Sequence, residues 1–401
     1  MPKVEAPVEF TGYRARQNPA AGPCCTRLKF GASHLSYCTN IHPAETWEET
    51  REMLQSRVPA VRDLVAGGEP FGIGLRLSAL AAAELLEEDR LARFKDWLDE
   101  TNTYVFTING FPYGSFHGTR VKERVFQPDW TERARLDYTK DLFRILAAIA
   151  RPETAASVST LPGSHKTFGA DESLIRRNLI ELADWLENLA AETGHDFHLG
   201  LEPEPLGHFE NTAETVAFFE RLHAGAADLE AIRRRIGVNY DACHFALQYE
   251  DAGDSLDRMA AAGIRISKIH LSSALAFDPR DAAALEAIRA FDEPVYFHQV
   301  IARDDAGGIR RFIDLPDFLA AETSALTEAR VHFHIPLDAE PAPPLRSTRG
   351  HAREVLEWRK NHPQACRHYE IETYTWSVLP AEMQRPVEQQ IAGEYRWVRN
   401  G

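Results

Sequence analysis

Cysteine is scarce in this sequence of 401 residues, and its five positions show no paired spacing. The five are Cys24, Cys25, Cys38, Cys243 and Cys366, and no two of them form a C-x-x-C motif. An odd number of cysteines without that motif argues against a disulfide framework and against a structural zinc site. We therefore expect reduced thiols, as in a cytoplasmic protein.

Long apolar runs are also absent. The sequence contains no stretch of about 18 apolar residues, the length that a helix needs to cross a bilayer. The opening stretch, "MPKVEAPVEFTGYRARQNPAAGP", has no apolar segment of the kind that signal peptides carry. We therefore expect no membrane partner and a cytoplasmic location.

Positive charge is in deficit. Lys and Arg number 45 against 60 Asp and Glu, which gives a formal net charge of -15. Phosphate backbones and anionic lipids repel such a chain. We therefore expect a small-molecule substrate and no nucleic-acid partner, and the sequence leaves the oligomeric state open.

Two motifs of common enzyme classes are missing. No G-x-G-x-x-G opens a helix after a strand, which argues against a dinucleotide-binding sheet. No G-x-S-x-G elbow is present, which argues against a serine hydrolase of the α/β class.

The sequence does contain a regular alternation of short apolar runs and longer amphipathic stretches, such as "DESLIRRNLIELADWLENLAAETG". This alternation predicts parallel strands joined by helices, and about eight such units favour a closed (β/α)8 barrel. Nine candidate strands are one too many. Part of the surplus is explained by a late β-hairpin around "DDAGG", within an insertion at about 276–328. Of 266–273 and 331–337, we favour the first as the seventh barrel strand.

The predicted domain organisation is simple. Residues 1–27 lack periodicity and carry Pro and Gly, so we expect a tail on the surface. Residues 28–401 form one barrel domain that includes the insertion. A hydrophobic content of 44% is enough to fill a core of that size.

Acidic and imidazole side chains recur where the predicted strands end, which in a (β/α)8 barrel is the face that carries the active site. The group comprises His34, His117, Glu202, Glu204, Asp241, His244, His270, His332, His334, Glu370 and Glu372. Buried carboxylates that converge need cations or shared protons, and two Glu, one Asp and one His suit a divalent ion. Alternation places Glu202 with Glu204, and Glu370 with Glu372, on shared faces. We choose Glu202 and Glu372, and leave open whether His270 or His334 is the histidine ligand.

Several of these motifs resemble those of the xylose-isomerase-like TIM barrels, a superfamily of sugar isomerases, ketose 3-epimerases and endonuclease IV. The motifs are "GLEPEP", "YDACH", "KIHLSS" and "EIETYTW". The resemblance implies one divalent metal ion (Mn, Mg, Co or Zn) bound by Glu202, Asp241, His270 and Glu372. It also implies that His244 binds substrate, or ligates zinc as its counterpart does in endonuclease IV.

A closer resemblance covers most of the chain. "TINGFPYGSFHG", "VKERVFQPDW", "YFHQV", "HFHIP" and "IETYTWSVLP", among others, are similar in order to the EboE metabolite-traffic proteins. That resemblance implies a role in the processing or traffic of a secondary metabolite, through a reaction that it does not specify.

The predicted activity is the isomerisation or epimerisation of a sugar or another hydroxy-carbonyl metabolite. Glu202 and Glu372 are expected to exchange a carbon-bound proton, and His244, His298, His334 and His117 to bind substrate. Two alternatives stay open. One is a metabolite-binding or delivery protein with a metal-lined pocket and little turnover. The other is a phosphoesterase related to endonuclease IV, which the acidic charge disfavours.

Overall fold

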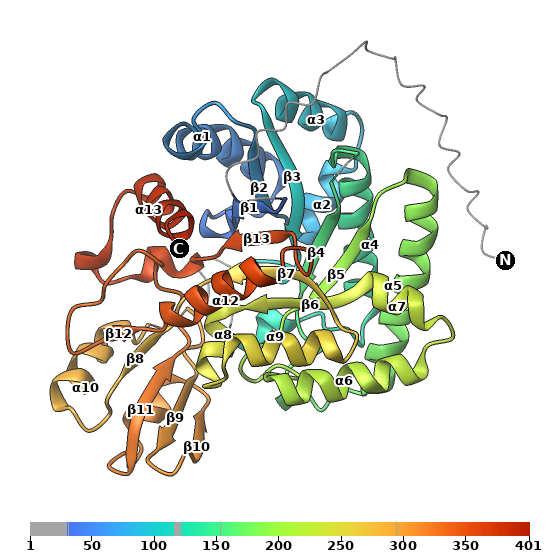
Figure 1. Cartoon of the computed structure of the whole chain (residues 1–401). Coiled ribbons are helices and arrows are strands. Elements are labelled where there is room, and N and C mark those ends of the chain that lie inside the picture. Colours follow the sequence, from blue (N-terminus) through green and yellow to red (C-terminus); the bar gives the residue numbers. More distant parts are fainter. Residues whose placement is uncertain (1–29, 31, 116–121, 153, 294) are drawn as a thin grey trace.

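The computed structural model describes residues 30, 32–115, 122–152, 154–293 and 295–401 (Figure 1). The predicted tail at 1–27 and the predicted substrate-binding residue His117 lie outside these described residues. Among the described residues, no helix has both the length and the apolar character needed to span a membrane.

A parallel eight-stranded sheet forms the centre of the molecule. Its strands are β1 (His34–Tyr37), β2 (Phe71–Arg76), β3 (Thr103–Asn109), β4 (Ala156–Thr160), β5 (Phe197–Leu201), β6 (Ile236–Asp241), β7 (Arg265–Leu271) and β13 (His368–Ile371). They lie in the order β1-β13-β7-β6-β5-β4-β3-β2. A parallel bridge between Cys38 and Gly74 brings the two ends of this order together. The predicted (β/α)8 barrel is confirmed, and 266–273 overlaps its seventh strand, β7.

Helices surround the barrel (Figure 1). They are α1 (Trp47–Val65), α2 (Ala79–Leu85), α3 (Arg90–Glu100), α4 (Arg133–Ile149), α5 (Glu172–Thr193), α6 (Thr212–Gly225), α7 (Leu229–Arg235), α8 (Ala242–Leu247), α9 (Ala252–Ala261), α12 (Arg349–Asn361) and α13 (Val387–Arg399). Their ends follow from local chemistry. The α1 helix begins at a capping box, in which the Thr46 hydroxyl accepts from Glu49 N and the Glu49 carboxylate accepts from Thr46 N. Gly194, in a left-handed conformation at φ +77°, ends α5.

Short 3-10 helices occur in the connections. They are η1 (Thr39–Ile41), η2 (Lys122–Phe126), η3 (Lys166–Phe168), η4 (Arg289–Phe291), η5 (Tyr374–Val378) and η6 (Ala381–Met383). Of these, η1 and η5 follow barrel strands β1 and β13 and so lie at the mouth of the barrel, near the residues that follow the other strands.

A second, antiparallel sheet is inserted between β7 and α12, beside the barrel (Figure 1). It contains β8 (Leu275–Phe277), β9 (Val300–Asp304), β10 (Ile309–Phe312), β11 (Leu326–Val331) and β12 (Arg346–Ser347), with the short helices α10 (Ala282–Ile288) and α11 (Leu315–Leu319). The β9 and β10 strands form the predicted hairpin, and Gly307 supplies the positive φ of its turn. This sheet has its own apolar core, which includes Phe277, Val300 and Phe333.

The C-terminal helix α13 is joined to the end of β13 by a buried carboxyl group. Glu394 is fully buried, and its Oε1 accepts hydrogen bonds from the Thr373 hydroxyl at 2.7 Å and from Leu337 N at 3.0 Å. Burial is the main cause that raises the pKa of Glu394 to about 7. The folded protein therefore holds a proton there that the unfolded chain releases at lower pH.

We predict that Glu394 makes the protein less stable as the pH rises from about 4.5 to about 7. In that range the unfolded chain loses this proton before the folded protein does. The contribution of Glu394 to the free energy of unfolding therefore falls by about 3 kcal/mol. Glu394→Gln keeps a neutral group there and removes this component. Urea unfolding of both proteins at pH 5 and pH 8 measures the difference, and equal pH dependence in the two would contradict the prediction.

Gly74 in β2 leaves the space that the Glu370 side chain occupies inside the barrel. A Cβ atom at Gly74 would lie 1.6 Å from Glu370 Oε1 and 2.8 Å from Tyr37 O. We predict that Gly74→Ala destabilises the fold by about 3 kcal/mol, because strands in a packed barrel cannot separate to admit a methyl group.

The matched control is Gly350→Ala in α12, where nothing lies within 4 Å of the added Cβ. This control should stabilise the protein by about 0.5 kcal/mol, because alanine is the better helix former. Chemical denaturation compares the two variants. A Gly74→Ala variant as stable as the parent protein would refute the close packing of β2 against Glu370.

Candidate metal centre

Four neighbouring strands place acidic or imidazole side chains at one end of the barrel. Asp241 ends β6 and His270 lies near the end of β7, while Glu202 and Glu372 directly follow β5 and β13. Backbone hydrogen bonds from Glu202 N to Thr160 O and from Glu372 N to Leu271 O hold the last two in the register of the sheet. All four side chains are buried, with at most 4% of each residue exposed.

The Nδ1 atom of His270 is the point around which the three carboxylates gather. It lies 3.0 Å from Glu202 Oε1, 3.1 Å from Glu372 Oε2 and 3.4 Å from Asp241 Oδ2. One ligand atom from each of the four residues lies within 4.8 Å of every other. The structure therefore brings together all four residues that the sequence analysis assigned to a metal ion.

His270 is oriented from inside the barrel. Its Nε2 donates to Glu370 Oε2 at 3.0 Å, and the ammonium group of Lys268 contacts the same oxygen. Glu370 and Lys268 are completely buried. Because Glu370 accepts the hydrogen bond from Nε2, the Nε2 proton stays in place and Nδ1 is the nitrogen that can offer a lone pair to a metal ion once it is deprotonated.

The carboxylates are also fixed by their neighbours. Asp241 Oδ1 accepts from Ser272 Oγ at 2.7 Å and from His244 N at 3.0 Å. Glu372 Oε1 accepts from Asn40 Nδ2 at 2.9 Å and from Asn109 Nδ2 at 3.0 Å. In each case one oxygen is held by protein donors and the other faces His270 Nδ1.

Electrostatics favours the charged forms of these groups. Burial alone raises the pKa of Asp241, but the nearby His244, His334 and His270 hold that pKa well below its usual range. Burial lowers the pKa of His270, but Glu372 and Glu202 outweigh it and hold that pKa well above the usual range. The three carboxylates thus create a strong local demand for positive charge.

The residues fit a divalent cation. Asp241 Oδ2 is buried and makes no hydrogen bond among the described residues, although it lies toward His270. Three carboxylate oxygens and one imidazole nitrogen form a mixed donor set that suits Mn²⁺, Mg²⁺, Co²⁺ or Zn²⁺. A cation at this point would offset the cost of burying the carboxylates together.

The other histidines predicted to bind substrate have different surroundings. His244 and His334 lie beside the centre, together with His332. The ring of His298 has protein partners at both nitrogens, with Nε2 2.8 Å from Glu293 Oε1 and Nδ1 3.0 Å from His332 O. The structure therefore does not bring His298 to the four-residue group, and its contact with substrate stays a prediction.

A pocket opens over the centre and contains about 610 Å³ of empty space, including the part open to solvent. Its polar lining comprises Asn40, Asn109, Lys122, Glu202, Glu204, His244, Gln299, His332 and Glu372. Aromatic side chains, among them Phe111, Phe126 and Tyr374, form much of the remaining wall. The pocket joins a charged floor to apolar walls, as sites for small molecules commonly do.

Sequence reasoning missed the residues that support the centre. Asn40 follows the first strand and Asn109 ends the third. A single amide side chain at the end of a strand does not indicate a metal site. The sequence presents Glu370 only as an alternative to Glu372. Both side chains do lie on the same face of the strand, but Glu370 pairs with His270 and lies deeper inside the barrel than Glu372. Glu204, which shares a face with the chosen Glu202, also lines the pocket.

Comparisons with known proteins find similarity to solved structures and not to known sequences. No model of a known protein family matches the chain, and no curated protein sequence matches it either. Among solved structures, the probable 3-DHS dehydratase AsbF involved in petrobactin synthesis, from Bacillus anthracis, is 12% identical, with a TM-score of 0.47 over 92% of this chain and 99% of that one.

Two further solved structures are similar to the same extent. The IOLI protein with a binding zinc atom is 9% identical, with a TM-score of 0.47 over 92% of this chain and 97% of that one. An L-ribulose 3-epimerase is 12% identical, with a TM-score of 0.45 over 91% of this chain and 92% of that one. The resemblances to the xylose-isomerase-like proteins and to the EboE proteins stay predictions, while the chain's own strand order establishes the (β/α)8 barrel fold.

Proposed function

We propose that the protein is a divalent-metal-dependent isomerase or epimerase of a sugar or a related hydroxy-carbonyl metabolite. The observation that carries this proposal is the meeting of Glu202, Asp241, His270 and Glu372 within 4.8 Å on the floor of a pocket. A divalent ion held there by these four residues would act as a Lewis acid on the substrate oxygens.

Glu202 and Glu372 are the proposed acid and base. Both line the pocket, and they come from strands on opposite sides of β6 and β7 in the sheet order. Carboxylates that approach a substrate carbon from two sides can remove a proton from one face and return one to the other. Asn40 and Asn109 fix one oxygen of Glu372 and so limit the directions in which this carboxylate can act.

We place the protein in the cytoplasm, in the processing or traffic of a secondary metabolite, with a small molecule and no nucleic acid as its partner. The resemblance of several motifs to those of the EboE proteins and the net charge of -15 support this placement. A delivery protein with little turnover is the competing function, and it differs from ours in making no use of two carboxylates beside the ion.

We predict that the protein exchanges a carbon-bound proton of a ketose or hydroxy-ketone with solvent. The metal-loaded protein, incubated in D₂O with a panel of such compounds, should incorporate deuterium next to a carbonyl, as measured by NMR. Glu202→Gln and Glu372→Gln should each slow the exchange about 100-fold or more, because general acid–base groups contribute that much.

Glu357→Gln is the matched control, since Glu357 lies on α12 with 65% of its side chain exposed and should leave the exchange rate unchanged. Titration calorimetry on the same compounds separates the competing functions. Tight binding without any deuterium incorporation would reject the isomerase and support the delivery protein.

A further inference from the structure

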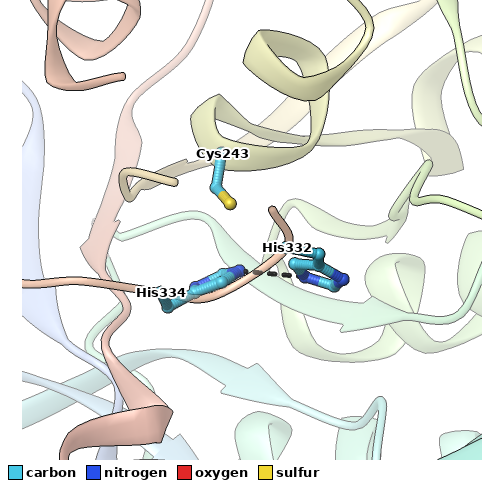
Figure 2. A group of neighbouring side chains, drawn as sticks. All are labelled: Cys243, His332 and His334. Carbon is cyan, nitrogen blue, oxygen red and sulfur yellow. Dashed lines mark hydrogen bonds between the residues drawn. The ribbon is translucent and has the colours of Figure 1, made fainter. Parts of the chain in front are cut away.

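Three histidines beside the four-residue centre point their Nε2 atoms at one another. The distances between these atoms are 3.1 Å for His244 and His332, 3.3 Å for His332 and His334, and 3.4 Å for His334 and His244. Figure 2 shows His332 and His334 side by side, with Cys243 nearby. His244 comes from α8 of the barrel, while His332 and His334 follow β11 of the inserted sheet.

Each of these rings is held through its other nitrogen. Nδ1 lies 3.0 Å from Pro203 O in His244, 2.7 Å from Gln299 Oε1 in His332 and 3.1 Å from Glu372 O in His334. The orientation of the Gln299 amide is set by its Nε2, which donates to Pro205 O at 3.3 Å. Because all three partners are oxygens that only accept, each Nδ1 must carry a proton.

The three Nε2 atoms are therefore lone-pair donors when the imidazoles are neutral. They face one another in a buried space, since His244, His332 and His334 are 3%, 4% and 0% exposed. Three lone pairs that meet without a proton or a cation between them repel each other. The fixed Nδ1 atoms prevent the rings from flipping to relieve this repulsion.

The spacing matches that of a metal ion. Zinc binds imidazole nitrogen at about 2.0–2.1 Å in tetrahedral sites, which separates two such ligands by about 3.3 Å. Glu204 offers a fourth ligand. One of its oxygens lies within 4.8 Å of the His244 and His332 nitrogens, and its Oε1 has no hydrogen-bond partner among the described residues although Glu204 is only 8% exposed.

We propose that His244, His332 and His334, with Glu204 as the fourth ligand, form a second metal site that binds Zn²⁺. Its donor set of three nitrogens and one oxygen differs from that of the first centre, in which three oxygens meet one nitrogen. Imidazole-rich sites favour zinc and its neighbours among the transition metals, whereas carboxylate-rich sites also accept Mn²⁺ and Mg²⁺. The protein therefore holds two ions of different preference.

The two sites are neighbours that share one pocket. Asp241 belongs to the first group and also lies within 4.8 Å of His244 and His334. Glu204, His244 and His332 line the pocket with Glu202 and Glu372. A bound substrate can therefore reach both ions. The barrel alone cannot build the second site, because the inserted sheet supplies two of its three imidazoles. This inference is independent of the proposed isomerase activity.

The test is the metal content of the full chain, purified without chelator and dialysed against Zn²⁺ and then against buffer. Mass spectrometry of the metal should find two ions per chain in the parent protein. The double variant His332→Gln and His334→Gln should lose one, and His270→Gln should lose the other. His362→Gln, whose side chain is 43% exposed, is the matched control and should keep both.

A second measurement does not depend on the folding of any variant. The parent protein loaded with Co²⁺ should show the intense visible absorption of a tetrahedral ion, which added Zn²⁺ should abolish. One ion per chain in the parent protein, or two ions in the double variant, would overturn the second site. Failure of the isomerase appears separately, as absent deuterium exchange in a protein that holds both ions.

Discussion

The charge balance around His270 Nδ1 is the constraint on which the site depends. Three buried carboxylates surround this nitrogen at 3.0–3.4 Å, and each would be costly to bury without positive charge beside it. A protonated His270 supplies part of that charge, and a divalent ion supplies more while using the same nitrogen as a ligand. The close approach of the carboxylates therefore fits the cation site that we propose.

The barrel stabilises this arrangement with side chains at two depths. The upper layer holds the groups that face the pocket, including Glu202 and Glu372, and the layer below holds Glu370 and Lys268, whose opposite charges meet inside the barrel. The hydrogen bond from His270 Nε2 to Glu370 orients the ring so that Nδ1 faces the carboxylates of the centre. Asn40 and Asn109 bind one oxygen of Glu372, so that its other oxygen faces His270 Nδ1. Fixed orientation is what distinguishes a centre ready to bind an ion from a loose group of acids.

The sequence predicted the barrel and the convergence of acidic and imidazole side chains because both depend on local patterns, whereas the choice of His270 among the four residues came from the family resemblance. Strand–helix alternation is a local property, and a residue that ends a parallel strand lies at the mouth wherever that strand sits in the ring. Alternation also identified Glu370 and Glu372 as sharing a face. It could not tell which of them reaches the mouth, because that depends on the stagger between β13 and β7.

Other features depend on long-range packing and were beyond the sequence. The predicted hairpin is present, but it is one part of a five-stranded sheet whose fold returns His332 and His334 to the barrel. No spacing along the chain relates those residues to His244, which lies 88 positions before His332. The roles of Asn40, Asn109 and Lys268 likewise follow only from where the strands place them.

The most direct test of the central claim is anomalous X-ray diffraction from a crystal of the protein grown with Mn²⁺. The account predicts an anomalous peak within bonding distance of Glu202, Asp241, His270 and Glu372. Density there that fits only water, in crystals whose Mn²⁺ is available to other carboxylates, would contradict it.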